Sequence, residues 1–303
     1  MASRSRRLPF LLAVVLATAA CGAPAGADGD LVNGWAMLPA ARYVAPVAGQ
    51  CLAPGPFSAF EQPSAAVLTG IDCAEQHSVE VVATGTVAAD ALPAWDSDPV
   101  RAAYAACDRA AGDYAGGDWH TGRLLPFLSL PSGPAWAGGV RTWVCGLAEA
   151  ADDLFAPKPR TGSLRGGLKD PRPLALSCAA LDGGDLTPDG FYRSVDAVTP
   201  VSCTDPHDTE FVGVWAAPAG AFPADAQALN ATVSKACFTE VAAFMGLSAL
   251  QLYQRKDVYT FWDGLTRSQW QLGDRTAHCF LNVSTAKILH SSLKGLGTEP
   301  LPA

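Results

Sequence analysis

The 303-residue chain has only one long apolar run and few basic residues. After the run from Leu8 to about Leu16, no segment approaches the roughly 18 apolar residues that a membrane-spanning helix needs. The formal charge is -8 and no basic cluster is present, which makes the chain a poor candidate for binding nucleic acid. It also lacks a glycine-rich phosphate loop, a nucleophile elbow and the His-Glu helix motif of zinc hydrolases, so it has no signature of those enzyme classes.

The first twenty residues, "MASRSRRLPFLLAVVLATAA", combine early arginines with a short apolar run and then small residues, which predicts an export signal over residues 1–20. "TAAC" followed by glycine resembles a bacterial lipobox, in which Cys21 is acylated and becomes the mature N-terminus. The alternative is ordinary cleavage at the small residues. We expect an exported protein that is lipid-anchored to the outer face of the cytoplasmic membrane, with residues 21–47 as the lipidated cysteine and a flexible tether.

Eight cysteines remain after Cys21 is set aside as the lipid acceptor. An even number of cysteines in an exported chain predicts disulfides. They are Cys51, Cys73, Cys107, Cys145, Cys178, Cys203, Cys237 and Cys279.

The chain repeats itself. "CAEQHSVEVVATG" from Cys73 and "CTDPHDTEFVGVW" from Cys203 share a cysteine, a histidine four residues later and a glutamate seven residues later, at an offset of 203 − 73 = 130. Further on, "WAGGVRTWVC" and "WQLGDRTAHC" agree at Trp, Gly, Arg, Thr and Cys without a gap. Because the shared positions keep their order along the chain, we infer that a module of about 120 residues has been duplicated. The repeated polar and aromatic residues are His77, Glu80, Trp136 and Arg141 in the first copy, and His207, Glu210, Trp270 and Arg275 in the second.

The repeat gives the domain boundaries. We place module 1 at residues 48–168 and module 2 at residues 175–297. The Pro-containing segment 169–174 reads as a linker and residues 298–303 as a tail.

Each module is predicted to be an α+β unit, a small antiparallel sheet with one main helix over a face. Residues 79–87 and 209–217 are rich in β-branched and aromatic residues and predict strands. Residues 99–116 and 224–246 have apolar residues at helical spacing and end at glycines suited to a helix C-terminus. A further strand is expected at 123–130 and at 257–262, and a Gly-containing hairpin before the last strand, which ends at Cys145 or Cys279.

This layout favours one pairing of the cysteines. The first two of each module flank neighbouring extended segments, and the third lies in mid-helix within reach of the final strand. The preferred pairs are Cys51–Cys73, Cys107–Cys145, Cys178–Cys203 and Cys237–Cys279. Four cysteines allow three pairings, and the sequence alone does not decide among them.

The combined pattern resembles the septum formation domain of actinobacterial membrane proteins and lipoproteins. The residues that carry the resemblance are Cys-x3-His-x2-Glu-Val, a Trp-x2-Gly-(Asp)-Arg-x3-Cys segment and a trailing Gly-Ser-Leu-Arg-Gly. It covers nearly the whole mature chain as two tandem copies. Copy one departs at Val140, where copy two has Asp274. The resemblance implies a link to division or envelope assembly, and it brings no catalytic residues.

Three interpretations of Cys203, His207 and Glu210 are open: a zinc site, a Cys-His nucleophilic pair, or architecture. The first two need a free thiolate, whereas every cysteine of one copy has a counterpart in the other, as disulfide partners would. We favour architecture, with His77 and His207 bonded to a backbone carbonyl or to the nearby glutamate. A spacing of three along an extended strand puts His and Glu on opposite faces, so their contact requires a turn or bulge.

The remaining repeated residues also favour packing. A tryptophan at the same place in both copies (Trp136, Trp270) is more often core than a ligand groove, and Arg141 and Arg275 are expected to brace a carboxylate or carbonyl. Residues without a counterpart in the other copy are better candidates for specific binding. They are Trp119, His120, Trp262 and Asp263.

The sequence therefore favours an envelope-tethered, non-catalytic binding or assembly lipoprotein without a cofactor or metal. Its partner is expected to be an envelope protein or a cell-wall component, which the sequence does not identify. The alternatives are a cell-wall hydrolase or a carrier of apolar ligands, each with a site between the two modules.

Overall fold

The computed structural model describes residues 44–53, 69–151 and 157–302. These residues belong to one compact unit, Tyr43–Ala303. The predicted export signal, Cys21 and the tether up to residue 43 lie outside the described residues. Among the helices of the described part, none combines the length and apolar character needed to cross a bilayer.

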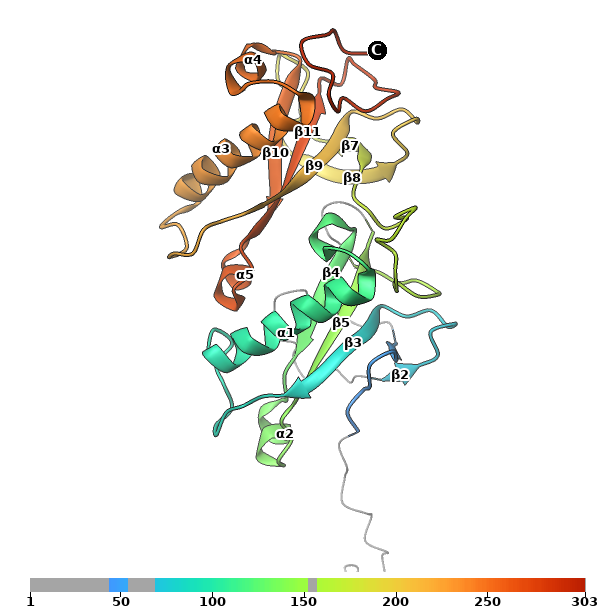
Figure 1. Cartoon of the computed structure of the whole chain (residues 1–303), viewed down its shortest axis with the longest axis vertical. Helices are drawn as coiled ribbons and strands as arrows, with labels where there is room; N and C mark the ends of the chain where they lie inside the picture. The colour runs from blue at the N-terminus through green and yellow to red at the C-terminus, as the bar shows by residue number, and fades with distance from the viewer. Residues whose placement is uncertain (1–43, 54–68, 152–156, 303) are drawn as a thin grey trace, which may run out of the picture. The chain divides into compact units, whose positions relative to one another are not determined.

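Module 1 is an antiparallel sheet with one long helix over a face (Figure 1). The strand order is β2-β1-β3-β5-β4, and β6 pairs with β5. Helix α1 (Asp98–Ala115) packs against β3, β4 and β5, and a 3-10 turn, η1 (Trp119–Thr121), follows it. The strands are β1 (Cys51–Leu52), β2 (Gly70–Ile71), β3 (Val79–Thr86), β4 (Leu124–Ser129), β5 (Thr142–Ala150) and β6 (Pro157–Lys158).

Module 2 repeats this plan with the order β10-β11-β9-β7-β8. Helix α3 (Ala226–Met245) packs against β9, β10 and β11, and the short α4 (Ala249–Gln254) follows. The strands are β7 (Cys178–Gly183), β8 (Val195–Val201), β9 (Thr209–Ala216), β10 (Val258–Gly264) and β11 (Thr276–Val283). The predicted fold class, two α+β modules with small antiparallel sheets, is confirmed.

Both long helices end where the sequence predicts. Gly116 and Gly246 adopt left-handed backbone angles (φ 82° and 74°), a conformation that glycine reaches without the steric cost of a Cβ. Asp225 begins α3 by accepting a hydrogen bond from the backbone N–H of Ala228. The core face of α1 follows helical spacing, because Val100, Ala103, Tyr104, Cys107, Ala111 and Tyr114 are all buried.

The predicted Gly-containing hairpin precedes each last strand, since β4 pairs antiparallel with β5 and β10 with β11. Each connection also contains a short helix that the sequence analysis did not predict: α2 (Gly133–Ala137) before β5 and α5 (Arg267–Leu272) before β11. Ser132 caps α2 by accepting from the N–H of Ala135, and Thr266 and Gln269 cap α5 reciprocally. These local side-chain caps satisfy backbone donors that would be open in a hairpin loop, so one helical turn forms.

Two disulfides link each module internally, in the pairs that the sequence layout favours. They are Cys51–Cys73, Cys107–Cys145, Cys178–Cys203 and Cys237–Cys279, with Cα–Cα distances of 5.1, 5.3, 5.1 and 5.1 Å. Cys107 ties α1 to β5, and Cys237 ties α3 to β11. The chain-entropy model gives each closed loop about 3–4 kcal/mol of stabilisation. The disulfides also fit an exported protein.

Candidate functional site

The glutamate of the repeated motif is a buried anchor. Glu80 lies at the start of β3 and is 0% exposed. Its carboxylate accepts hydrogen bonds from the Tyr114 hydroxyl (2.6 Å), the Ser163 hydroxyl (2.9 Å) and the Leu164 backbone N–H (2.7 Å). Glu80 therefore joins the sheet to α1 and to the trailing "GSLRG" segment, and its charge is balanced by three donors as a buried carboxylate requires.

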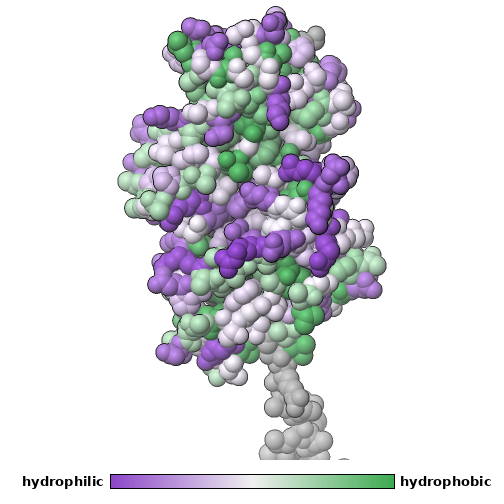
Figure 2. All heavy atoms as spheres, in the orientation of Figure 1, coloured by the Kyte–Doolittle hydropathy of each residue, from purple (hydrophilic) through white to green (hydrophobic). Residues whose placement is uncertain are grey.

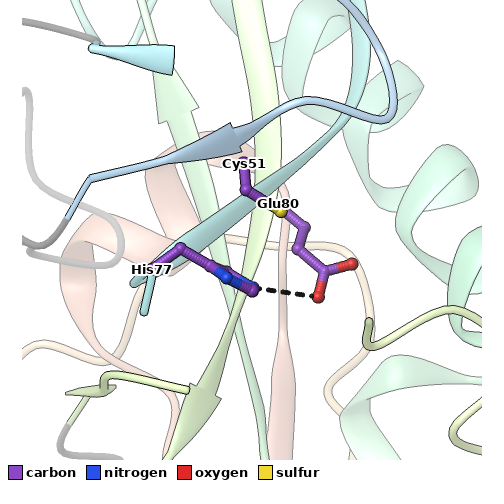
Figure 3. Close-up of side chains that lie close together, drawn as sticks. All are labelled: Cys51, His77 and Glu80. Carbon is purple, nitrogen blue, oxygen red and sulfur yellow. Dashed lines mark hydrogen bonds and ion pairs between the residues drawn. The ribbon is translucent and has the colours of Figure 1, made fainter. Parts of the chain in front are cut away.

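The neighbouring histidine orients this anchor (Figure 3). His77 Nδ1 lies 2.9 Å from the Glu75 carbonyl oxygen, and Nε2 lies 3.3 Å from Glu80 Oε1. His77 precedes β3 and forms an isolated backbone bridge with Arg160. Because His77 stands outside the regular strand, it escapes the alternation that would place it on the face opposite Glu80.

The second copy repeats the anchor with one donor fewer. Glu210 accepts from the Ser292 hydroxyl (2.5 Å) and the Leu293 N–H (2.7 Å), and His207 Nδ1 lies 2.8 Å from the Asp205 carbonyl. The His207–Glu210 distance lengthens to 3.9 Å. Phe244 occupies the position equivalent to Tyr114 and packs in the module core, so no hydroxyl reaches Glu210 from that side.

Each anchor also lies beside a cysteine. The sulfur of Cys51 is grouped with His77 and Glu80, and that of Cys178 with His207 and Glu210, all within 4.8 Å. The sequence had placed Cys203 in this group, but Cys203 is the disulfide partner of Cys178. Since both sulfurs are in disulfides, neither has a thiolate for zinc or for nucleophilic attack. With Cys51 and Cys178 in disulfides, the geometry supports a structural role for His77, Glu80, His207 and Glu210.

The repeated Trp–Arg pairs also pack within their modules. The Arg141 guanidinium lies 3.8 Å from the Trp136 ring centre and donates to the Trp136 carbonyl at 2.7 Å. Arg275 lies 5.2 Å from the Trp270 ring, whose Nε1–H donates to the Gly220 carbonyl at 3.0 Å. These are cation–π and hydrogen-bond contacts of the fold.

A different cluster joins the two modules. His120 of η1 lies 2.7 Å from Asp118 through Nδ1 and 3.5 Å from Asp274 through Nε2, the latter a charge pair longer than a hydrogen bond. The Tyr104 hydroxyl donates to the other oxygen of Asp274 at 3.0 Å. His278 Nε2 lies 2.9 Å from the His120 carbonyl oxygen. Asp274 and His278 belong to module 2, and the other three residues belong to module 1.

Burial and charge set the protonation of this cluster. Burial acts to lower the pKa of His120, but the carboxylates of Asp118 and Asp274 raise it to about 9. Burial, with the neighbouring His120 charge, lowers the pKa of His278 to about 4. The pKa of Asp118 is lowered by its hydrogen bond to His120; burial acts to raise the pKa of Asp274, but His120 lowers it overall. We call this cluster of Tyr104, Asp118, His120, Asp274 and His278 the joint. At neutral pH it therefore holds one imidazolium, His120, between the carboxylates of Asp118 and Asp274, and His278 beside it is neutral.

A cleft of about 720 Å³ opens next to the cluster, with walls from both modules. A smaller hollow of about 300 Å³ shares Asp108, His120, Ala216 and Thr276 with it. The lining residues are Asp108, Arg109, Gly112, Asp113, Gly116, Gly117, Asp118, Trp119 and His120 from module 1, and Val214, Ala216 and Thr276 from module 2.

The copy-specific residues divide between two places. Trp119 and His120 line the cleft, stacked with ring centres 3.7 Å apart, and Trp119 donates to Asp108 at 2.7 Å. Trp262 and Asp263 lie on β10, outside the cleft lining, and Trp262 donates to Asn230 at 3.0 Å.

Sequence reasoning missed the roles of Tyr104, Asp118 and Asp274. The available signal was Asp274, an acidic residue where the first copy has Val140.

The fold and its anchors define a disulfide-linked α+β protein built from two similar modules. A family model described as "Septum formation" matches residues 48–279, so the chain belongs to the septum formation family. Comparison with curated proteins and with solved structures found no match.

Proposed function

We propose that the protein is an envelope-tethered, non-catalytic binding or assembly protein of septum formation. The observation that carries this proposal is the use of the repeated motif. Glu80 and Glu210 accept hydrogen bonds from their own modules, and the adjacent sulfurs are in disulfides. The motif residues hold two scaffolds in shape, and this leaves the surface between the modules for a partner.

We further propose that the modules are tandem copies of one septum formation domain. Strand β3 corresponds to β9, α1 to α3 and β5 to β11, in the same order in both modules. The anchors correspond too, because Glu80 binds the Leu164 N–H and Glu210 binds the Leu293 N–H. A single ancestral unit explains both sets of contacts.

The proposed attachment to the membrane is an acyl group on Cys21. Intact-mass analysis of the mature protein from membranes tests it, with and without reductant. We expect acylation at Cys21 and a mass gain on reduction that corresponds to four disulfides. Cys21→Ala should release the protein from the membrane fraction, with Cys21→Ser as a second variant. An unmodified N-terminus with the protein still membrane-bound would refute this anchor.

The binding role is tested by site-specific crosslinking in living cells that produce the native protein. Photo-crosslinkers at the cleft rim should capture an envelope protein or peptidoglycan fragment, and a fluorescent fusion should concentrate at division sites. A matched crosslinker on the exposed Leu250 of α4 gives the background. If the fluorescent fusion is spread evenly over the envelope and the cleft crosslinkers capture no partner above background, the proposal is wrong.

The alternative with a specific observation behind it is a cell-wall hydrolase acting at the cleft. Asp118, His120 and Asp274 form an acid–base group at the edge of a 720 Å³ cleft. Incubation of purified protein with peptidoglycan, followed by mass analysis of soluble fragments, separates the two functions. Fragment release that His120→Gln abolishes would favour the hydrolase. The carrier of apolar ligands has less support, because Asp108, Arg109, Asp113 and Asp118 line the cleft.

A further inference from the structure

Strand β9 has one edge that is largely open. Strand β11 pairs with it from Thr209 to Ala216, whereas β7 pairs with it only at Thr209 and Glu210. A last backbone bond on the β7 side runs from the Phe211 N–H to the Ser177 carbonyl. Within the part of the chain that the structure describes, no backbone bond reaches that edge between Val212 and Ala216. An open strand edge is a template for another strand.

The open donors can be assigned. The Ala217 N–H donates to the Arg275 carbonyl at 2.8 Å, on the β11 side. Backbone N–H groups of successive strand residues point to opposite edges of the strand. The N–H groups of Ala217 and Trp215 therefore point toward β11, and those of Ala216 and Val214 point the other way. The N–H of Val214 and that of Ala216 therefore point to the open edge. Both residues line the cleft.

The opposite wall of the cleft supplies negative charge. It is the C-terminal part of α1, where Asp108 and Asp113 lie about one and a half turns apart. The cleft is also lined by Asp118 and by two cations, Arg109 and the protonated His120. Asp108 already accepts from Trp119, whereas Asp113 is exposed. Gly112, Gly116 and Gly117 also line this wall, and the Lys169 side chain packs against Gly116. The carbonyl end of α1 adds partial negative charge.

On the face shown in Figure 2, strongly hydrophilic residues gather around the middle of the molecule, and hydrophilic and hydrophobic residues are mixed above and below. The cleft differs because an open strand edge and acidic side chains meet there.

We propose that this cleft binds an extended peptide segment with basic side chains, which adds as a strand to the open edge of β9. In a paired strand, every second side chain would project on the same side as Val214 and Ala216, into the cleft. Lysine or arginine at those positions would meet Asp113 and Asp108. The inference rests on the proposed binding role and specifies the partner's chemistry.

The test uses the mature chain, with Cys21 replaced by Ala for solubility, and a defined probe. The probe is an acetylated, amidated octapeptide of alternating valine and lysine. Isothermal titration should detect binding that falls at least about tenfold when lysine is replaced by glutamate. N-methylation of alternate backbone nitrogens should weaken it by a similar factor, because it removes the bonds to the strand edge. Equal affinity of the methylated probe would overturn the proposal.

Two variants locate the site on the protein. Asp113→Lys should weaken the probe at least about tenfold, and its matched control is Asp189→Lys, an exposed acid outside the cleft. Val214→Pro removes a donor on the open edge, where proline is tolerated in strands, and should have a similar effect. If both lysine variants weaken binding equally, attraction to net charge explains it and the proposal is wrong.

The outcomes separate this inference from the wider role. If cellular crosslinking captures a partner equally with Asp113→Lys, the cleft inference fails and the binding role stands. If the probe binds as expected but no partner is captured, the wider role fails. Self-association in analytical ultracentrifugation that Val214→Pro abolishes would replace the peptide with a second copy of the chain and overturn the proposal.

Discussion

Tyr104 of the first module donates a hydrogen bond to Asp274 of the second, across 3.0 Å, and both side chains are buried. Burial raises the pKa of Tyr104 well above its usual value, so the hydroxyl keeps its proton over the ordinary pH range. The same carboxylate lies 3.5 Å from His120. One aspartate of module 2 thus contacts a neutral donor and a cation from module 1. We therefore expect the contact between the modules to respond to pH and to single substitutions.

The joint should weaken above neutral pH. The folded pKa of His120, about 9, exceeds the unfolded value of about 6.5. The folded state therefore binds more protons in this window, and its extra stability is complete below pH 6.5 and lost as pH rises through about 9. We expect a loss on the order of 2–3 kcal/mol, measured by urea unfolding at intervals from pH 6.5 to 9.5. His120→Gln should flatten this slope, whereas His290→Gln, at an exposed site, should not.

The neighbouring histidine has the opposite effect. The folded pKa of His278, about 4, lies below the unfolded value, so the unfolded state binds more protons between about pH 4 and 6.5. Stability should fall as pH drops through that window, and the maximum should lie near pH 6.5. NMR titration of the imidazole carbons checks both values directly. A His278 signal that titrates near 6.5 would contradict the assignment.

Loss of the buried anchor should destabilise module 1 strongly. Glu80→Ala leaves the Tyr114 and Ser163 hydroxyls and the Leu164 N–H without their acceptor, at a cost of about 3–5 kcal/mol. Glu210→Ala should cost less, because Phe244, at the position equivalent to Tyr114, has no hydroxyl to donate to Glu210. Urea unfolding midpoints provide the comparison, and exposed Glu75→Ala should change stability by less than about 0.5 kcal/mol. Equal values for Glu80 and Glu75 would refute the anchor.

Each disulfide that joins a helix to a strand should stabilise its own module. The double variant Cys107→Ala, Cys145→Ala opens a link between residues 38 apart, and the loss should be about 3–4 kcal/mol. Removal of Cys237 and Cys279, which are 42 apart, should have a similar effect in module 2. Chemical denaturation of each variant, with intact mass to verify the remaining bridges, measures the change. A loss under 1 kcal/mol would show that packing alone holds α1 on its sheet.

The strands and helices that the sequence analysis predicted are those with a clear pattern over a few neighbouring residues. Strand Val79–Thr86 and helix Ala226–Met245 lie close to their predicted ranges, because side-chain periodicity and terminal glycines act over a few residues. Short helices α2 and α5 were missed, since one turn gives almost no periodicity and depends on caps such as Ser132 and Thr266. The sequence analysis anticipated the His77–Glu80 contact. It singled out the trailing segment that contains Leu164 but not the bond from Leu164 to Glu80, because the two residues are 84 apart in the chain.

The sequence by itself determined the repeated residue pattern, the positions of its cysteines and the candidate bracing residues, because each occurs twice along the chain. Only the tertiary structure decided which unrepeated residues meet. Tyr104, the pair Asp118 and His120, and the pair Asp274 and His278 come from three separate segments. The contacts between module 1 and module 2 depend on how one module docks on the other. Such docking follows from surfaces formed after each module folds, so spacing along the chain does not encode it. The cleft and the open edge of β9 arise at the same step.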